Sequence, residues 1–193
     1  MDLLKFFMEA GKLKRLPRSG WVIDKVKNSE SVADHSFRLA LLVLVLGEKR
    51  TDIDVNKAVK MALIHDIAES KTGDIVIDKK WEYGPNTPNK KFPKLTQKEK
   101  SELEKRAFEE ISSLLGEQGK EYFELWKEFE ERKSKESGFV NQLDNLETVL
   151  QAMEYELQEK RKLQHYFDYY NKRVTDPAML KILEEIEAKR PDL

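Results

Sequence analysis

Apolar residues recur along this chain at every third or fourth position, which is the spacing of amphipathic α-helices. Alternation with a period of two, which indicates strands, is not convincing anywhere in the sequence. The pattern therefore predicts an all-α fold of about six to eight helices. The expected helices cover approximately residues 2–14, 31–48, 54–69, 96–116, 120–132, 137–160 and 176–189.

Helix-capping signals support several of these boundaries. Thr96 and Glu99 form a T-x-x-E capping box, in which each side chain binds the backbone N–H of the other residue. Asp54 is placed to cap the third helix, and Asp176 is followed by a proline at the first position of the last one. The segment 71–93 is rich in glycine and proline, so we expect a loop there.

The 193 residues contain no repeat, low-complexity tract or interdomain linker, so we expect one domain over residues 1–193. Charged residues make up 37% of the chain, against roughly 25% in an average globular protein. Since 35 basic residues are balanced by 36 acidic ones, the chain has no excess positive charge that would indicate nucleic-acid binding. A surface rich in lysine and glutamate fits a thermophilic protein, and it equally fits any protein with long solvated helices.

The chain has no cysteine, which excludes disulfides, thiolate–zinc sites, iron–sulfur clusters and a cysteine nucleophile. Any bound metal must therefore use histidine, carboxylate and water as ligands. The longest apolar run, 39–46, is far shorter than the roughly 20 residues that span a bilayer. The amino terminus also lacks the layout of a signal peptide. We expect a soluble, cytoplasmic protein without a membrane partner.

Four ionisable side chains occupy apolar helix faces. His35 lies on the buried stripe of helix 31–48, because leucines follow it at i+4, i+7 and i+11. His65 and Asp66 follow apolar residues at helical spacing in the next predicted helix, and Asp144 lies among leucines in the long one. Burying a carboxylate without a partner is energetically costly. A shared cation would account for all four residues.

The ligand chemistry of such a site is consistent. Two imidazoles and two carboxylates suit one divalent cation such as cobalt, manganese, nickel, iron or zinc. Four protein ligands on a six-coordinate ion leave positions for water and a phosphate oxygen, as in a catalytic site. The alternative for each histidine is a hydrogen-bonded core residue. The chain has only three histidines, however, and two of them fall on buried stripes.

The order His35, His65-Asp66, Asp144 matches the H…HD…D signature of the HD-domain superfamily, in which these residues bind the metal. The local strings resemble those of the YfbR-type 5′-deoxynucleotidases, and most of all the branch called HD domain-containing protein 2. These strings are PRSGW, ESVADHSFRLA, ALIHDIAESKTGD and FVNQLDNLETVLQAMEYE. The resemblance spans the chain and implies a compact HD-domain helical bundle, a homodimer and removal of the 5′-phosphate from (deoxy)nucleoside 5′-monophosphates.

The resemblance also implies two catalytic residues. Glu69 is the glutamate of HD-x-x-E, which lies beside the attacking water in similar enzymes, and Asp74 is the active-site aspartate of TGD. We expect the metal to polarise a phosphate oxygen while Glu69 orients water for in-line attack on phosphorus. The alternative for Glu69 is a solvated carboxylate at the end of a helix.

Three further residues are candidates for substrate binding. Negative charge that builds on the phosphoryl and leaving oxygens calls for a nearby cation, and Arg18 and Arg38 are candidates unless they are ordinary surface arginines. In bacterial YfbR-type enzymes, the tryptophan that corresponds to Trp21 follows an arginine and disfavours a 2′-hydroxyl. Here Gly20 precedes Trp21, which leaves the role of that arginine to Arg18. The alternative for Trp21 is a core residue.

Other interpretations remain open. The chain could hydrolyse another phosphate ester, such as a nucleoside triphosphate, a cyclic nucleotide or an alarmone, or it could bind nucleotides without catalysis. Complete retention of the ligand set and Glu69 favours an enzyme. The loop at 81–95 is a candidate lid, and His165, in the aromatic segment LQHYFDYY, is expected to serve packing or an interface.

Overall fold

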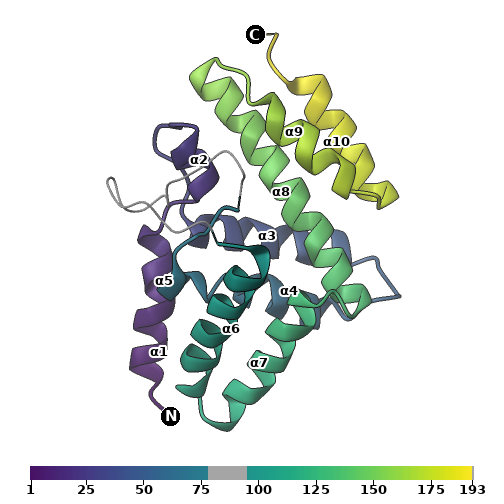
Figure 1. Ribbon diagram of the computed structural model, residues 1–193. Helices are drawn as coiled ribbons and strands as arrows, with labels where there is room; N and C mark the ends of the chain where they lie inside the picture. Colours follow the sequence, from purple (N-terminus) through teal and green to yellow (C-terminus); the bar gives the residue numbers. More distant parts are fainter. Residues whose placement is uncertain (78–94, 193) are drawn as a thin grey trace.

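The computed structural model describes residues 1–77 and 95–192, which form helices and no named strand (Figure 1). The all-α prediction is confirmed. Seven of the described α-helices have eight or more residues, and three short ones were not predicted as separate helices. The α-helices are α1 (Leu3–Ala10), α2 (Ser19–Ile23), α3 (Val32–Gly47), α4 (Val55–Ile64), α5 (Glu69–Thr72), α6 (Gln97–Ser113), α7 (Glu117–Glu130), α8 (Lys135–Glu159), α9 (Gln164–Tyr170) and α10 (Pro177–Lys189).

Side-chain caps begin the central helices. The predicted capping box of α6 is present, with Thr96 N–H donating to Glu99 Oε2 over 2.7 Å and Glu99 N–H donating to Thr96 Oγ1 over 3.2 Å. Ser31 and Asp34 form the same arrangement at the start of α3. Capping satisfies N–H groups that lack partners in the first turn. The start of α3, and hence the position of His35 in its first turn, is therefore fixed locally.

The segment predicted as a single helix over 54–69 is helical from Val55 to Ile64, and only its last residue, Glu69, belongs to α5. Helix α4 ends at Ile64. Hydrogen bonds between residues three apart, such as that from the Glu69 N–H to the Asp66 C=O (3.0 Å), form a tight turn before α5. His65 and Asp66 lie in this turn, and Glu69 begins α5. The turn points all three polar side chains toward the interior. Of the candidate lid at 81–95, only residue 95 lies within the described residues.

The core forms where α3 and α4 pack against the long helix α8, which crosses the molecule diagonally in Figure 1. Leu39, Met61 and Leu143, one from each of these helices, are fully buried. Helices α9 and α10 pack on α8, while α6 and α7 pair beside α4. The consecutive helices α3 and α4 therefore meet the distant helix α8, and the candidate ligands His35, His65 and Asp144 lie where the three converge.

Helix α3 is apolar around much of its surface. One face enters the core, whereas the other exposes Phe37, Leu41, Leu44 and Val45. Despite this composition, none of the helices in the described part of the chain is long and apolar enough to cross a membrane. The exposed apolar face of α3 therefore needs another explanation.

Candidate metal centre

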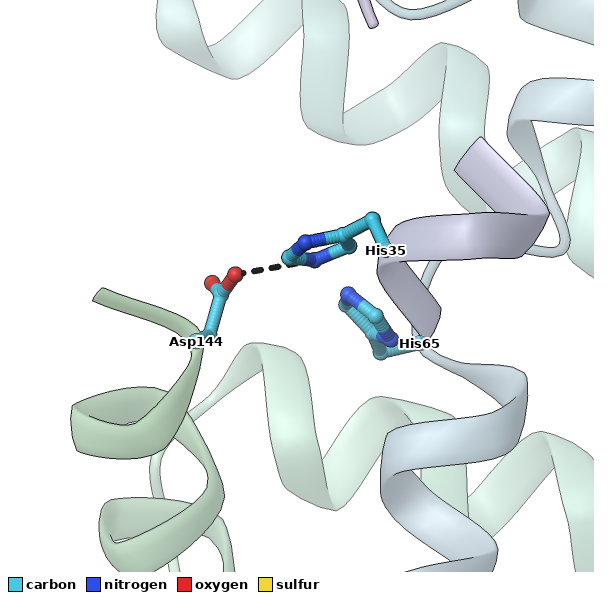
Figure 2. Close-up of side chains that lie close together, drawn as sticks. All are labelled: His35, His65 and Asp144. Atoms are coloured by element: carbon cyan, nitrogen blue, oxygen red, sulfur yellow. Dashed lines mark ion pairs between the residues drawn. The ribbon is translucent and has the colours of Figure 1, made fainter. Parts of the chain in front are cut away.

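Three potential metal ligands meet from α3, the end of α4 and α8 (Figure 2). Oδ1 of Asp144 lies 3.1 Å from Nε2 of His35, and the centroids of the His35 and His65 rings are 5.4 Å apart. One ligand atom from each residue lies within 4.8 Å of the other two. This spacing allows one cation to contact all three side chains.

Asp66 lies against the same group. Its Oδ2 atom is 3.0 Å from Nε2 of His65 and 3.9 Å from Nε2 of His35, and it accepts a hydrogen bond from Arg18 over 3.1 Å. Burial would raise the pKa of Asp66, but His65, Arg18 and His35 outweigh burial and lower the pKa below its ordinary value. Asp66 is therefore ionised at neutral pH. The structure thus brings the four predicted ligands together.

The donor set fits a divalent cation. The Nε2 atoms of His35 and His65 are buried and make no hydrogen bond with the described residues. Buried polar atoms rarely lack a partner, and each such case calls for an explanation. Two unpartnered imidazole nitrogens beside two aspartates match the ligand preferences of manganese, cobalt, nickel, iron and zinc.

Each imidazole is oriented through its other nitrogen. Nδ1 of His65 lies 2.8 Å from the backbone oxygen of Ala62, and Nδ1 of His35 lies 2.5 Å from Oε2 of the fully buried Glu147. A hydrogen at each Nδ1 satisfies these acceptors and leaves Nε2 free for a metal. Burial and Arg18 lower the pKa of His35, but Glu147 and Asp144 outweigh them and raise it to about 10, so a cation that binds Nε2 must displace a proton from it.

The structure does not bring Arg38 into the cleft, contrary to the expected role in substrate binding. Its Nε donates to Glu147 Oε1 over 2.9 Å, and its terminal nitrogens donate to Glu154 and Gln151. All three partners belong to α8. The two carboxylates hold the guanidinium away from Nε2 of His35, the atom that would face a metal. Sequence reasoning missed Glu147, although a carboxylate three residues after Asp144 on an apolar helix was a usable signal.

Glu69 and Asp74 both lie at the site. Glu69 is only 5% exposed, and its Oε2 atom has no hydrogen-bond partner among the described residues. Burial, together with Asp66 and Asp74, raises the pKa of Glu69 well above its ordinary value. Asp74 accepts from the Ser19 N–H over 2.6 Å, and the Ser19 hydroxyl donates to the Asp74 backbone oxygen. These bonds hold the segment that carries Arg18 against the site.

A cleft of about 780 Å³ opens beside this group. Its lining includes the predicted residues Arg18, Trp21, Asp66, Glu69, Asp74 and Asp144. Trp21 is only 2% exposed, packs 4.2 Å from Tyr166 between ring centroids, and donates from Nε1 to Glu30 over 2.8 Å. Trp21 is therefore a core residue with one edge on the cleft, which combines the two interpretations of its sequence position.

Lys100 of α6 also lines the cleft and was not predicted. Burial lowers the pKa of Lys100, but Glu104, Glu69 and Asp74 outweigh burial and raise it. Arg18 behaves similarly, because the surrounding carboxylates outweigh its burial and raise its pKa well above the ordinary value. Both side chains are cationic at neutral pH and able to face a phosphate.

Comparison with known proteins identifies the family of this chain. A model described as HD domain matches residues 10–186. This chain belongs to the HD-domain family. The HD-domain chain is 40% identical to the 5′-deoxynucleotidase HDDC2 of Dictyostelium discoideum, over 98% of both chains. It is 39% identical to the human 5′-deoxynucleotidase HDDC2, over 98% of this chain and 86% of the human one.

Solved structures agree with the HD-domain fold. The PH0347 protein of Pyrococcus horikoshii is 32% identical and superimposes with a TM-score of 0.75, over 96% of this chain and 99% of that one. A conserved hypothetical protein of Pyrococcus furiosus is also 32% identical, with a TM-score of 0.72 over 97% and 98% of the two chains. The expected family membership is therefore confirmed.

Proposed function

We propose that this HD-domain protein is a metal-dependent phosphohydrolase that removes the 5′-phosphate from (deoxy)nucleoside 5′-monophosphates. The observation that carries the proposal is the pair of buried, unpartnered imidazole nitrogens of His35 and His65 beside a cleft of nucleotide size. The names of the two curated relatives support the choice of substrate, because both are 5′-deoxynucleotidases.

His35, His65, Asp66 and Asp144 would hold one divalent cation, whose identity among cobalt, manganese, nickel, iron and zinc is left to experiment. When bound, such a cation supplies Lewis-acid chemistry, neutralising phosphate charge and making water more acidic. Arg18 already binds Asp66, so it lies where it can also contact a phosphate oxygen. Lys100 supplies a second positive charge from another wall of the cleft.

Glu69 is placed to act as the general base. Its raised pKa means that its carboxylate holds a proton more strongly than an exposed glutamate, which favours accepting one from the attacking water. The unpartnered Oε2 atom is an acceptor available for that water. Asp74 acts differently, since its hydrogen bonds with Ser19 fix the position of the neighbouring Arg18.

We further propose that the protein is a single-domain cytoplasmic homodimer. The exposed apolar side chains of α3, namely Phe37, Leu41, Leu44 and Val45, offer a contiguous surface for a second copy. Light scattering after size exclusion tests the assembly: a mass near twice 22.7 kDa is expected, and a stable monomer at micromolar concentration would contradict the homodimer.

A panel of substrates and metals tests the activity. The protein, stripped with a chelator, is incubated with each deoxynucleotide and ribonucleotide monophosphate in the presence of each candidate metal, and released phosphate is measured. Matched nucleoside triphosphates and cyclic nucleotides run in parallel. We expect release from the monophosphates that depends on added metal. Hydrolysis of triphosphates or cyclic nucleotides alone, detected by chromatography of the nucleotide products, or no hydrolysis of any substrate, would contradict the proposal.

A further inference from the structure

Tyrosine side chains of α9 form one wall of the cleft. Tyr166 packs on Trp21, and Tyr170 lies nearly parallel to Tyr166, with 8° between the ring planes and 6.2 Å between the centroids. Tyr169 meets Tyr170 edge to face at 4.8 Å. This aromatic wall runs outward from the buried Trp21 to Tyr169, whose exposed fraction is 53%.

Apolar residues also follow Asp74 along the cleft. Ile75, Val76 and Ile77 all line it, and Val76 and Ile77 are 40% and 39% exposed. Ligand pockets characteristically combine apolar and aromatic walls with a few polar groups that fix orientation. Here the polar groups include those of the metal centre, and the two apolar walls are available for a part of the ligand that is not charged.

The aromatic wall adjoins the metal centre. Burial raises the pKa of Tyr170 to about 12, against the influence of Arg18, and the nearby carboxylate of Asp144 adds to the rise. The phenol ring therefore lies within electrostatic reach of the residues that would meet the phosphate. The guanidinium of Arg173 lies 3.6 Å from the centroid of Tyr169 and holds that ring in place.

We propose that the α9 tyrosines, together with residues 75–77, form a subsite that binds the nucleobase by stacking. The inference rests on the proposed function, since it assigns a binding site to the base of the same nucleotide substrate. A base stacked on Tyr169 or Tyr170 extends from a phosphate at Arg18, with the sugar between them beside Trp21. Stacking uses the π-face that every base has, so both purine and pyrimidine nucleotides are accepted.

The experiment compares two substrates that differ only in the base. One is a deoxynucleoside 5′-monophosphate, and the other is 2-deoxyribose 5-phosphate, which keeps the sugar and phosphate. Tyr169→Ala and Tyr170→Ala should each raise the KM for the nucleotide by roughly 5- to 100-fold, the range for loss of base stacking. Their kinetics on the sugar phosphate should stay at the wild-type level, and Tyr169→Phe and Tyr170→Phe should behave as wild type on both.

An unphosphorylated deoxynucleoside gives a second measurement, because it contains the base without the phosphate. It should inhibit the wild type competitively and lose this effect in the alanine variants. Tyr122→Ala on α7, which is not among the lining residues, serves as the matched control and should retain inhibition. Thermal midpoints identify any variant that fails to fold. If Tyr170→Ala fails to fold, Tyr169→Ala, at the more exposed position, provides the test.

The outcomes separate this subsite from the proposed function. A wild type that hydrolyses no nucleoside monophosphate contradicts the function and the subsite together. If the wild type hydrolyses them and the alanine variants lose activity on both substrates equally, or on neither, the function stands and the subsite is overturned. Loss of activity on the nucleotide, with activity on the sugar phosphate retained, supports the subsite.

Discussion

Oε2 of Glu147 lies 2.5 Å from Nδ1 of His35, and neither side chain is exposed to solvent. The second oxygen of this carboxylate accepts from Arg38, so a buried negative charge is balanced on both sides. A carboxylate bound to the outer nitrogen of a metal-binding histidine fixes its tautomer and ring orientation. We infer that Glu147 is a positioning residue, which acts on the cation through His35.

Replacing Glu147 should therefore weaken cation binding without removing a ligand. Glu147→Ala is expected to raise the dissociation constant for Mn²⁺ roughly 10- to 100-fold, measured by calorimetry. Glu147→Gln, whose amide oxygen still accepts from Nδ1, should lose less. Glu154→Gln is the control, since Glu154 binds Arg38 but not His35. Equal affinities for all the variants would make Glu147 only a partner for Arg38.

His65→Ala should abolish cation binding and activity. Elemental analysis should find metal in the wild type and not in the variant, and added cation should raise the thermal midpoint of the wild type only, since ligands stabilise the state that binds them. His165→Ala is a control for metal content, because His165 pairs with Asp24 and with none of the four candidate ligands. Full activity of the wild type in excess chelator would contradict the metal requirement.

Glu69→Gln removes the acceptor for a proton while preserving the size of the side chain. If Glu69 is the general base, kcat should fall by roughly 10²–10⁴, with metal content unchanged. Glu102→Gln, on the exposed side of α6, should leave kcat unaltered. An unchanged kcat in Glu69→Gln would reduce Glu69 to a structural carboxyl group, and loss of metal would make it a fifth ligand.

Trp21 should influence the choice of sugar. Because the ring is packed in the core, Trp21→Ala is expected to cost about 3–5 kcal/mol of stability, so Trp21→Phe is the better variant. The smaller ring should leave room for a 2′-hydroxyl and raise kcat/KM for ribonucleotides relative to deoxyribonucleotides. Matched nucleotide pairs measure this ratio, and an unchanged ratio would leave Trp21 with a packing role only.

Glu104 should make stability depend on pH. Burial, opposed by Lys100, raises the pKa of Glu104 to about 7 in the folded state, from 4.5. A raised carboxyl pKa means that the folded state binds the proton more tightly than the unfolded state does. The stabilisation by protonated Glu104 is therefore complete below pH 4.5 and is lost as pH rises through 7. The loss amounts to about 3 kcal/mol. Denaturant unfolding of Glu104→Gln from pH 5 to 8 should lack this decline, whereas Glu102→Gln should retain it.

Local signals account for what could be predicted from the sequence. The helical period predicted buried faces for His35 and Asp144; His35 is fully buried and Asp144 is partly buried, and the Thr96–Glu99 box is present as expected. The break after α4 was not predictable from periodicity, because Ile67 and Ala68 continue the apolar pattern through the turn. The resemblance to a known family supplied the roles proposed for Glu69 and Asp74, which no spacing rule gives.

Long-range contacts account for what could not be predicted. Arg38 follows His35 by one turn, and nothing in that helix indicates that α8 offers Glu147 and Glu154 as partners. Lys100 stands among many lysines on α6, and its place on the cleft depends on how that helix packs. The tyrosines of α9 lie in a segment without polar and apolar alternation, so their common direction emerged only in three dimensions.

The three residues in Figure 2 come from α3, the turn after α4, and α8, and no short stretch of chain contains them all. A partly folded chain in which α8 has not yet joined α3 and α4 lacks Asp144 at the centre. Cation affinity is therefore a property of the completed fold, and bound cation reports on native chains alone. In a denaturation experiment, release of the cation should coincide with loss of the tertiary core, which makes the ion an intrinsic probe of cooperativity.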